Sequence, residues 1–159
     1  MKKPLPCSIP ALHHSNLSSL RRKWRRRWKN SPRYRSASRI DDSLPSNSYI
    51  KLIDTLDRNQ SALLTQLRTG HSPLNQHLFR IRRSETPTCP HCRGITPKTV
   101  KHFLLHCPHY QHERHLLRRK LRRNADSLPF LLSDATATLP LLKFIHATKR
   151  FARTPPPPP

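Results

Sequence analysis

The chain has 159 residues, which is room for one domain or for a modest core with flexible ends. Only 34% of the residues are hydrophobic and 17 are proline, so the core needs a supplement such as a bound metal ion. Lys and Arg number 31 against 8 Asp and Glu, and no apolar run is long enough to cross a bilayer, which argues against a membrane protein.

The charge balance indicates the partner and the compartment. Because phosphate neutralisation releases counterions, RNA or DNA is the polyanion expected to bind a chain of net charge +23, ahead of a membrane surface or a small-molecule substrate. The start of the chain lacks the apolar core of a signal peptide, so we expect an intracellular, nuclear location. In that reducing compartment the four cysteines are expected to bind metal or to remain thiols.

The first part of the chain divides into three predicted segments. Residues 1–15 carry three prolines without periodicity and are predicted to be a disordered leader. Residues 16–29 are predicted to form a basic helix, because apolar residues recur three or four positions apart at Leu17, Leu20, Trp24 and Trp28. Its other face carries arginines, Arg25 and Arg26 among them, which either contact phosphates or are simply solvated. Residues 30–47, rich in Ser, Pro and Arg, are predicted to be a linker.

Residues 48–151 are predicted to form one helical domain. Its first helices are expected over 48–56, over 57–68 with Asp57 as N-cap and Gly70 as the stop, and from Pro73 to about Arg82. In the last of these, Leu74, Leu78 and Ile81 are expected on one face.

Later helices are expected over 108–123, 127–133 and 138–151, and the first of them should turn Leu116, Leu117 and Leu121 inward. The closing prolines, within 152–159, are predicted to be a disordered tail in polyproline conformation.

The segment 89–107 carries a metal-binding pattern. Two cysteines lie two residues apart, a histidine follows after nine residues and a cysteine after four more, at Cys89, Cys92, His102 and Cys107. Two cysteines at that spacing point both sulfurs into one turn, and Gly94 suits the positive φ that such a turn requires. Thr96 and Pro97, or Thr99, are expected to start the short helix that presents the histidine.

Four protein ligands leave no open position, so we predict one structural Zn²⁺ and not a catalytic ion. The predicted fold class is therefore mostly α, a small zinc-stabilised helical domain with disordered N- and C-terminal tails.

Other ligand sets compete with this one. His106 would give two cysteines and two histidines, although a thiolate is the stronger zinc ligand, and His91 lies between the first two cysteines. Free cysteines or a Cys89–Cys92 disulfide would remove the site altogether. Three further histidines share one side of the helix predicted over 108–123 and offer a second, weaker metal hypothesis, at His109, His112 and His115.

Four motifs in order, WRRRWKNSPRY, QLRTGH, PLNQHLFRI and HFLLHCPHYQHER, carry a resemblance. Over roughly residues 16–150 the chain resembles the C-terminal region of non-LTR (LINE-type) retrotransposon reverse transcriptases, particularly fungal elements with an RNase H domain. In that family a basic Trp-containing stretch and two helices precede a zinc knuckle, and His102, Cys107 and Arg114 resemble its histidine, cysteine and following arginine helix. The resemblance implies that Cys89, Cys92, His102 and Cys107 bind zinc and that the module binds RNA or DNA. It also implies an upstream reverse transcriptase/RNase H polypeptide as a partner.

The catalytic parts of such an enzyme are not visible in the sequence. Polymerase and RNase H chemistry both need clustered carboxylates that hold metal ions, whereas the adjacent pair Asp41 and Asp42 lies in the predicted linker without an apolar strand before it. We therefore do not expect an enzyme.

The expected function is a non-catalytic nucleic-acid-binding zinc module. Besides Arg25 and Arg26, the residues expected to contact phosphates are Arg68, Arg80, Arg82, Arg83, Arg118, Arg119, Lys120, Arg122 and Arg123. Trp24, Trp28, Phe103 and Tyr110 are candidates for base stacking, although the two tryptophans and Phe103 fit a core better. The alternatives are a structural or protein-interaction zinc module and a retroelement remnant without a selected function.

Overall fold

The computed structural model describes residues 8–43 and 47–151, and its regular elements are helices. Within these ranges no β-strand occurs, and Thr88 and Pro97 form an isolated antiparallel bridge. The prediction of a mostly α fold is thereby confirmed. The chain divides into two compact units, residues 1–47 and 48–159, and each is described by itself.

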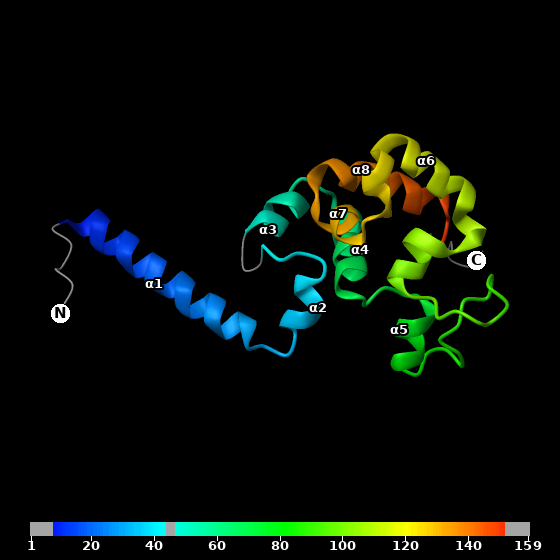
Figure 1. The fold of residues 1–159 in the computed structure, drawn as a ribbon, viewed down its shortest axis with the longest axis horizontal. Helices are drawn as coiled ribbons and strands as arrows, with labels where there is room; N and C mark the ends of the chain where they lie inside the picture. Colours follow the sequence, from blue (N-terminus) through cyan, green and yellow to red (C-terminus); the bar gives the residue numbers. More distant parts are fainter. Residues whose placement is uncertain (1–7, 44–46, 152–159) are drawn as a thin grey trace, which may run out of the picture. The chain divides into compact units, whose positions relative to one another are not determined.

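The first unit contains α1 (Ile9–Lys29) and α2 (Tyr34–Ser38) (Figure 1). The Ser8 side chain accepts a hydrogen bond from the backbone N–H of Ala11 at 3.3 Å and caps α1. Of the leader predicted over 1–15, residues 8–15 therefore belong to this cap and helix, whereas 1–7 lie outside the described residues. The prediction of a linker over 30–47 likewise missed α2.

The apolar stripe of α1 is exposed. Leu20 and Trp24 are 60% and 54% exposed, and α1 contains no buried residue. Trp28 is half-buried against Tyr34, with ring centroids 6.2 Å apart in a T-shaped pair. The expectation that Trp24 fits a core is therefore wrong, because helical spacing aligns a stripe but does not supply a second layer to cover it.

The second unit begins with α3 (Ser48–Ile53), α4 (Arg58–Thr69) and α5 (Asn75–Arg80). The Asp57 carboxylate accepts hydrogen bonds from the N–H groups of Asn59 and Gln60 at 2.8 and 2.9 Å. Gly70 ends α4 in the left-handed conformation at φ 74°. Both predictions for this helix are confirmed, because Asp satisfies free N–H groups at a helix start and Gly alone takes positive φ without strain.

From His102 to Ala147 the chain is almost continuously helical. The elements in order are η1 (His102–His106), η2 (Pro108–Tyr110), α6 (Gln111–Leu121), η3 (Arg122–Asp126), α7 (Leu128–Ser133) and α8 (Ala135–Ala147).

The core of this unit lies where α8 packs against α6 and α7, and where α4 packs against α7 (Figure 1). Each of these helices contributes buried side chains to it, among them Leu64, Leu67, Leu117, Leu131, Leu141 and Ile145. Phe103 of η1 joins the same core, because its ring centroid lies 5.7 Å from that of Phe144 and 5.5 Å from that of Phe151. The segment that carries the metal motif is thus anchored in the helical core.

Two aliphatic residues that were predicted to face the core, Leu116 and Ile81, are exposed. Leu116 is 47% exposed, because the buried face of α6 is set by Arg114 and Leu117, and the neighbouring position lies about 100° around the helix. Ile81 is 49% exposed, because α5 ends at Arg80, before the predicted end near Arg82.

Within residues 8–43 and 47–151, no helix combines the length and the apolar composition that crossing a bilayer requires. The polyproline tail predicted over 152–159 lies outside the described residues.

Candidate metal centre

A tight hairpin positions the first two candidate ligands. The backbone N–H of Cys89 donates to the carbonyl of Thr96 at 2.8 Å, and that of Lys98 donates to the carbonyl of Pro87 at 2.9 Å. These two bonds flank the bridge between Thr88 and Pro97 and hold the two arms together. The N–H of Cys92 in turn donates to the carbonyl of Cys89 at 3.2 Å, which closes the turn around the two sulfurs.

The tip of this hairpin has two consecutive residues with positive φ. Gly94 has φ 72°, as predicted, and Arg93 before it has φ 52°. Glycine takes this conformation without strain, whereas the Cβ of an arginine crowds the backbone there. Arg93 is therefore the strained residue of the turn. The N–H of Ile95 donates back to the carbonyl of Cys92 at 3.2 Å and completes the reversal.

A π-helical turn positions the other two candidate ligands. The Thr99 hydroxyl accepts a hydrogen bond from the N–H of His102 at 2.9 Å and starts the turn. The N–H of Cys107 then donates to the carbonyl of His102 at 2.8 Å, a bond that spans five residues. In an α-helix, positions five apart lie about 140° from each other, whereas an i→i+5 turn brings them close to the same side. The wide turn therefore lets His102 and Cys107 face one point.

The four side chains converge. Their ligand atoms all lie within 4.8 Å of one another. The Cys89 and Cys107 sulfurs are 3.8 Å apart, the Cys92 and Cys107 sulfurs 4.0 Å, and the Cys92 sulfur lies 3.3 Å from His102 Nε2. Zinc–sulfur bonds of about 2.3 Å place the corners of a tetrahedron about 3.8 Å apart, and a nitrogen corner slightly closer. The spacing and the donor set therefore fit one metal ion.

Burial shifts the proton equilibria of these ligands. It raises the pKa of Cys107 to about 11, against a smaller opposing effect of the backbone N–H of His109, and it also raises the pKa of Cys92. It lowers the pKa of His102, with the nearby His106, Lys98 and Arg114 charges acting in the same direction. At neutral pH these shifts favour the thiol forms of Cys92 and Cys107 and a neutral His102 imidazole in the metal-free site, and a metal ion has to displace the thiol protons.

The rival ligands lie elsewhere. His106 is exposed and outside the ligand group. The His91 ring stacks on that of His109, with centroids 3.7 Å apart and planes 4° apart, and both histidines are exposed. Cys89, Cys92 and Cys107 are free thiols and not a disulfide. Within the described ranges only one group of three or more ligands converges, so His109, His112 and His115 form no second site.

Two buried cations lie next to the site, Lys98 and Arg114. The spacing of residues in the sequence predicts a role for neither. Lys98 is 1% exposed, and its Nζ lies 3.4 Å from the hydroxyl of Tyr110. Burial lowers the pKa of its ammonium and Arg150 adds to that effect, whereas thiolates at Cys89 and Cys107 would oppose it. In the sequence it looks like any surface lysine.

Arg114 is the second buried cation, and only the family resemblance pointed to it. Its guanidinium donates to the backbone carbonyls of Leu104, Phe103 and Cys107 at 2.8, 3.3 and 2.9 Å. These carbonyls lie at the end of the π turn, and that of Cys107 also accepts a hydrogen bond from the backbone N–H of Tyr110 at 3.3 Å. Arg114 therefore fixes the backbone that carries His102 and Cys107.

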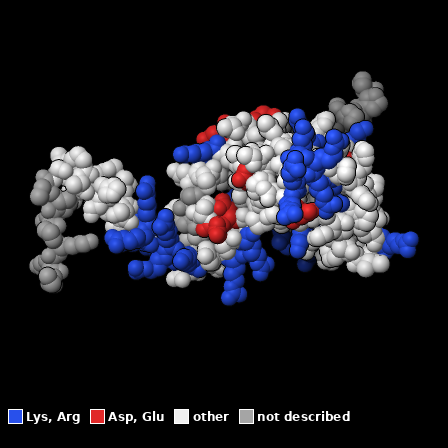
Figure 2. All heavy atoms as spheres, turned by 45° about the horizontal axis from the view of Figure 1, so that its top comes forward, with Lys and Arg blue, Asp and Glu red and all other residues white. Residues whose placement is uncertain are grey.

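Nearly all of the predicted phosphate-contacting residues are exposed. They lie on α1 at Arg25 and Arg26, at the end of α5 at Arg80, Arg82 and Arg83, and on α6 and η3 at Arg118, Arg119, Lys120, Arg122 and Arg123. Figure 2 shows a dense group of Lys and Arg side chains over α6. Arg118 also pairs with Asp126, at 2.7 Å between Nη2 and Oδ1.

Arg68 is the exception. Its guanidinium donates to the carbonyl of Leu132 at 2.8 Å and to the hydroxyl of Ser133 at 3.1 Å, and it lies 4.2 Å from the centroid of the Tyr49 ring. A half-buried guanidinium held in this way connects α4 to α7 and to α3. These contacts favour a packing role for Arg68 over contact with phosphates.

The proposed stacking aromatics also need correction. Phe103 and Tyr110 are 0% and 3% exposed, and their rings pack edge to face at 5.0 Å between centroids. Phe103 is a core residue, as the alternative interpretation held, and Tyr110 is closed to a base. The sequence could not separate them from surface aromatics, because burial depends on which helix lies opposite.

Comparisons of this chain with models of known protein families, with curated proteins and with solved structures find no match. The features of this chain that bear on function are the candidate metal centre and the distribution of charge.

Proposed function

We propose that the protein is a non-catalytic nucleic-acid-binding module whose second unit is stabilised by one structural Zn²⁺. The observation that carries the metal assignment is the convergence of three sulfurs and one imidazole nitrogen within 4.8 Å. Thiolate and imidazole together favour zinc over the oxygen-seeking ions Mg²⁺ and Ca²⁺. Because the protein supplies all four ligands, the ion has no open position for a substrate or for an activated water.

The charge of the loaded site supports this assignment. Three thiolates, a neutral imidazole and Zn²⁺ sum to one negative charge, and the buried ammonium of Lys98 supplies a compensating positive one. A buried lysine without a counter-charge would be costly, so its position beside the ligands is explained by a bound metal.

Nucleic-acid binding is supported by the excess of cations. Eight Asp and Glu can neutralise at most eight of the 31 Lys and Arg one to one, and most of the predicted arginines are exposed. Exposed arginines that protein carboxylates do not neutralise are the ordinary source of phosphate contacts. The order of motifs supports a module like the C-terminal part of a retrotransposon reverse transcriptase, acting with an upstream reverse transcriptase/RNase H polypeptide inside the nucleus.

Metal analysis combined with binding measurements tests the proposal. We expect one zinc per chain, loss of helical circular dichroism on chelation, and an affinity for RNA or DNA that falls steeply between low and physiological salt. Cys92→Ser should lose the zinc, and Cys7→Ser, which removes a cysteine outside the motif, is the matched control. A folded protein that takes up no zinc would overturn the metal assignment. Zinc uptake without affinity for any nucleic acid would instead favour the protein-interaction alternative.

A further inference from the structure

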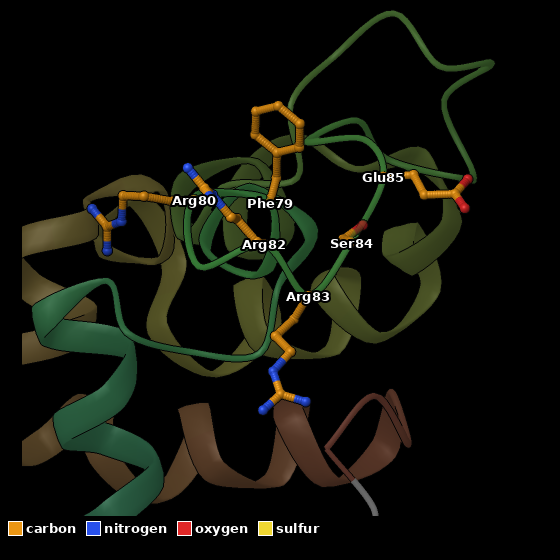
Figure 3. Close-up of a pocket in the computed structure, with 6 residues that line it drawn as sticks. All are labelled: Phe79, Arg80, Arg82, Arg83, Ser84 and Glu85. Atoms are coloured by element: carbon orange, nitrogen blue, oxygen red, sulfur yellow. The ribbon is translucent and has the colours of Figure 1, made fainter.

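The turn after α5 surrounds an open hollow of about 720 Å³ (Figure 3). Its lining consists of Phe79, Arg80, Arg82, Arg83, Ser84 and Glu85. Three guanidinium groups against one carboxylate make it electropositive, and an aromatic ring stands among them.

The backbone of the turn holds Arg82 in the left-handed conformation. The N–H of Arg83 donates to the carbonyl of Leu78 at 2.8 Å, and that of Arg82 donates to the carbonyl of Phe79 at 3.0 Å. This pair of bonds forms a Schellman motif, a common helix ending in which one residue after the helix takes the left-handed conformation. That residue here is Arg82, with φ 58°. Only glycine would be unstrained at this φ. The sequence has an arginine there instead, at a cost in backbone strain.

Phe79 is unusually open for a phenylalanine next to a folded core. It is 48% exposed, and among the described residues no aromatic ring packs against it. In Figure 3 its ring and the Arg82 side chain project from the same side of the turn, whereas Arg83 projects the opposite way. The ring face is thus available to a flat apolar ligand beside a cation.

Arg80 is held in place by a histidine pair. Its Nη2 lies 3.0 Å from Nδ1 of His77, and the His77 ring packs edge to face against that of His71, with centroids 5.2 Å apart. Desolvation lowers the pKa of His77, and Arg80 and His71 lower it further, which keeps Nδ1 free to accept from the guanidinium. A partly preorganised arginine loses less side-chain entropy when it binds phosphate.

We propose that this hollow binds an unpaired nucleotide of single-stranded nucleic acid, with its base stacked on Phe79 and its phosphates contacted by Arg80 and Arg82. The proposal rests on the proposed function and adds where the strand binds and in which form. An aromatic ring can stack on a base only if the base is unpaired and turned out, because a duplex hides the base faces. Phosphate contacts alone would not distinguish a single strand from a duplex.

The test uses the zinc-loaded full chain, with a labelled oligo(U), an oligo(dT) and a duplex of the same length, in fluorescence anisotropy titrations. Phe79→Leu keeps an apolar side chain but removes the stacking ring, and it should weaken single-strand binding by about fivefold or more while leaving duplex binding unchanged. Phe79→Trp should restore the affinity. The matched control is Ile81→Ala, because Ile81 is equally exposed on the same turn but does not line the hollow.

A second variant tests the phosphate contact without threatening the fold. Arg82→Gly relieves the positive φ and should fold at least as well as the wild type, yet reduce the slope of log affinity against log salt by about 0.7 for the single strand. Oligo(U) and oligo(dT) distinguish RNA from DNA as the source of the strand.

The outcomes separate this inference from the proposed function. Salt-dependent binding that Phe79→Leu leaves unchanged, or weakens equally for strand and duplex, overturns the stacking site alone. Binding of poly-glutamate to this turn in preference to the strands would indicate an acidic protein partner and would overturn it as well. Absence of any nucleic-acid binding by the wild type overturns both proposals.

Discussion

Arg114 donates a hydrogen bond from Nη2 to the backbone carbonyl of Cys107 at 2.9 Å, although the two side chains belong to different elements. The same guanidinium also holds the carbonyls of Leu104 and Phe103. A cation on α6 therefore fixes the backbone of a candidate metal ligand without touching its sulfur. We therefore expect zinc affinity and fold stability to be coupled through this one side chain.

Replacing Arg114 with methionine should lower the free energy of unfolding of the zinc-loaded protein by about 2–4 kcal/mol, because three backbone carbonyls lose a buried, charged donor. Urea unfolding monitored by circular dichroism measures this change. Arg118→Met on the same helix is the control and should change stability by less than about 1 kcal/mol, since its ion pair with Asp126 is exposed. Equal effects of the two variants would contradict the assigned role.

Cys107→Ser and His106→Ala distinguish the two candidates for the fourth ligand. Loss of Cys107 should weaken zinc binding by more than about 100-fold, since the loss of groups that only support a ligand already costs about 10- to 100-fold. His106 is exposed, so its loss should leave the affinity unchanged. Competition titration against a zinc chelator and the ligand-field spectrum of the Co²⁺-loaded protein measure both. The reverse order of effects would show that the rival set binds the metal.

Lys98→Met should have opposite effects on the two metal states. In the metal-free protein the variant removes a buried ammonium whose pKa burial already lowers, so stability should stay the same or rise. In the loaded protein it removes the charge that balances the negative site, so zinc affinity should fall about tenfold. Chelator competition and urea unfolding with and without zinc measure the two effects. A variant that destabilises both states equally would show that Lys98 only fills space.

The stability of the metal-free protein should pass through a maximum between about pH 6.5 and 9. The folded-state pKa of His102 lies below its ordinary 6.5, so its contribution is present above pH 6.5 and is lost as the pH falls. The pKa of Cys107 is raised from 9.0 to about 11, so its contribution is present below pH 9 and is lost as the pH rises.

Bound zinc should remove the alkaline loss, because the thiolates then become ligands, and should steepen the acid loss, because protons compete with the metal. Thermal melting from well below pH 6.5 to well above pH 9, with and without zinc, tests both limbs. An alkaline loss of equal size in the two states would contradict the site.

Arg68→Gln and Arg119→Gln should separate packing from phosphate contact. Arg68 holds the Leu132 carbonyl and covers Tyr49, so its loss should lower stability by about 1–3 kcal/mol and leave nucleic-acid affinity unchanged. Arg119 is exposed on α6, so its loss should leave stability unchanged and flatten the salt dependence. Urea unfolding measures the stability of each variant, and anisotropy titrations measure its affinity for nucleic acid. A loss of affinity in the folded Arg68 variant would restore it to the phosphate-contacting set.

The sequence by itself determined what depends on local hydrogen bonds. Asp57 and Gly70 begin and end α4 as expected, because a cap or a left-handed stop is set by the residue and its immediate neighbours. The positive φ of Gly94 and the four ligand positions also follow from short-range spacing. The mostly helical class follows from the 3.6-residue periodicity.

Only the tertiary structure decided what depends on the element opposite. Periodicity places residues on a common stripe but cannot tell which stripe another helix will cover, so Leu116, Ile81 and Trp24 were misjudged. The sequence favoured Cys107 over His106 as a ligand, but only the structure shows the π turn, held by Arg114 of a later helix, that brings Cys107 beside His102. Arg68 and Lys98 look like surface charges in the sequence, and only the packing around them shows that one holds two helices together and the other lies beside the metal ligands.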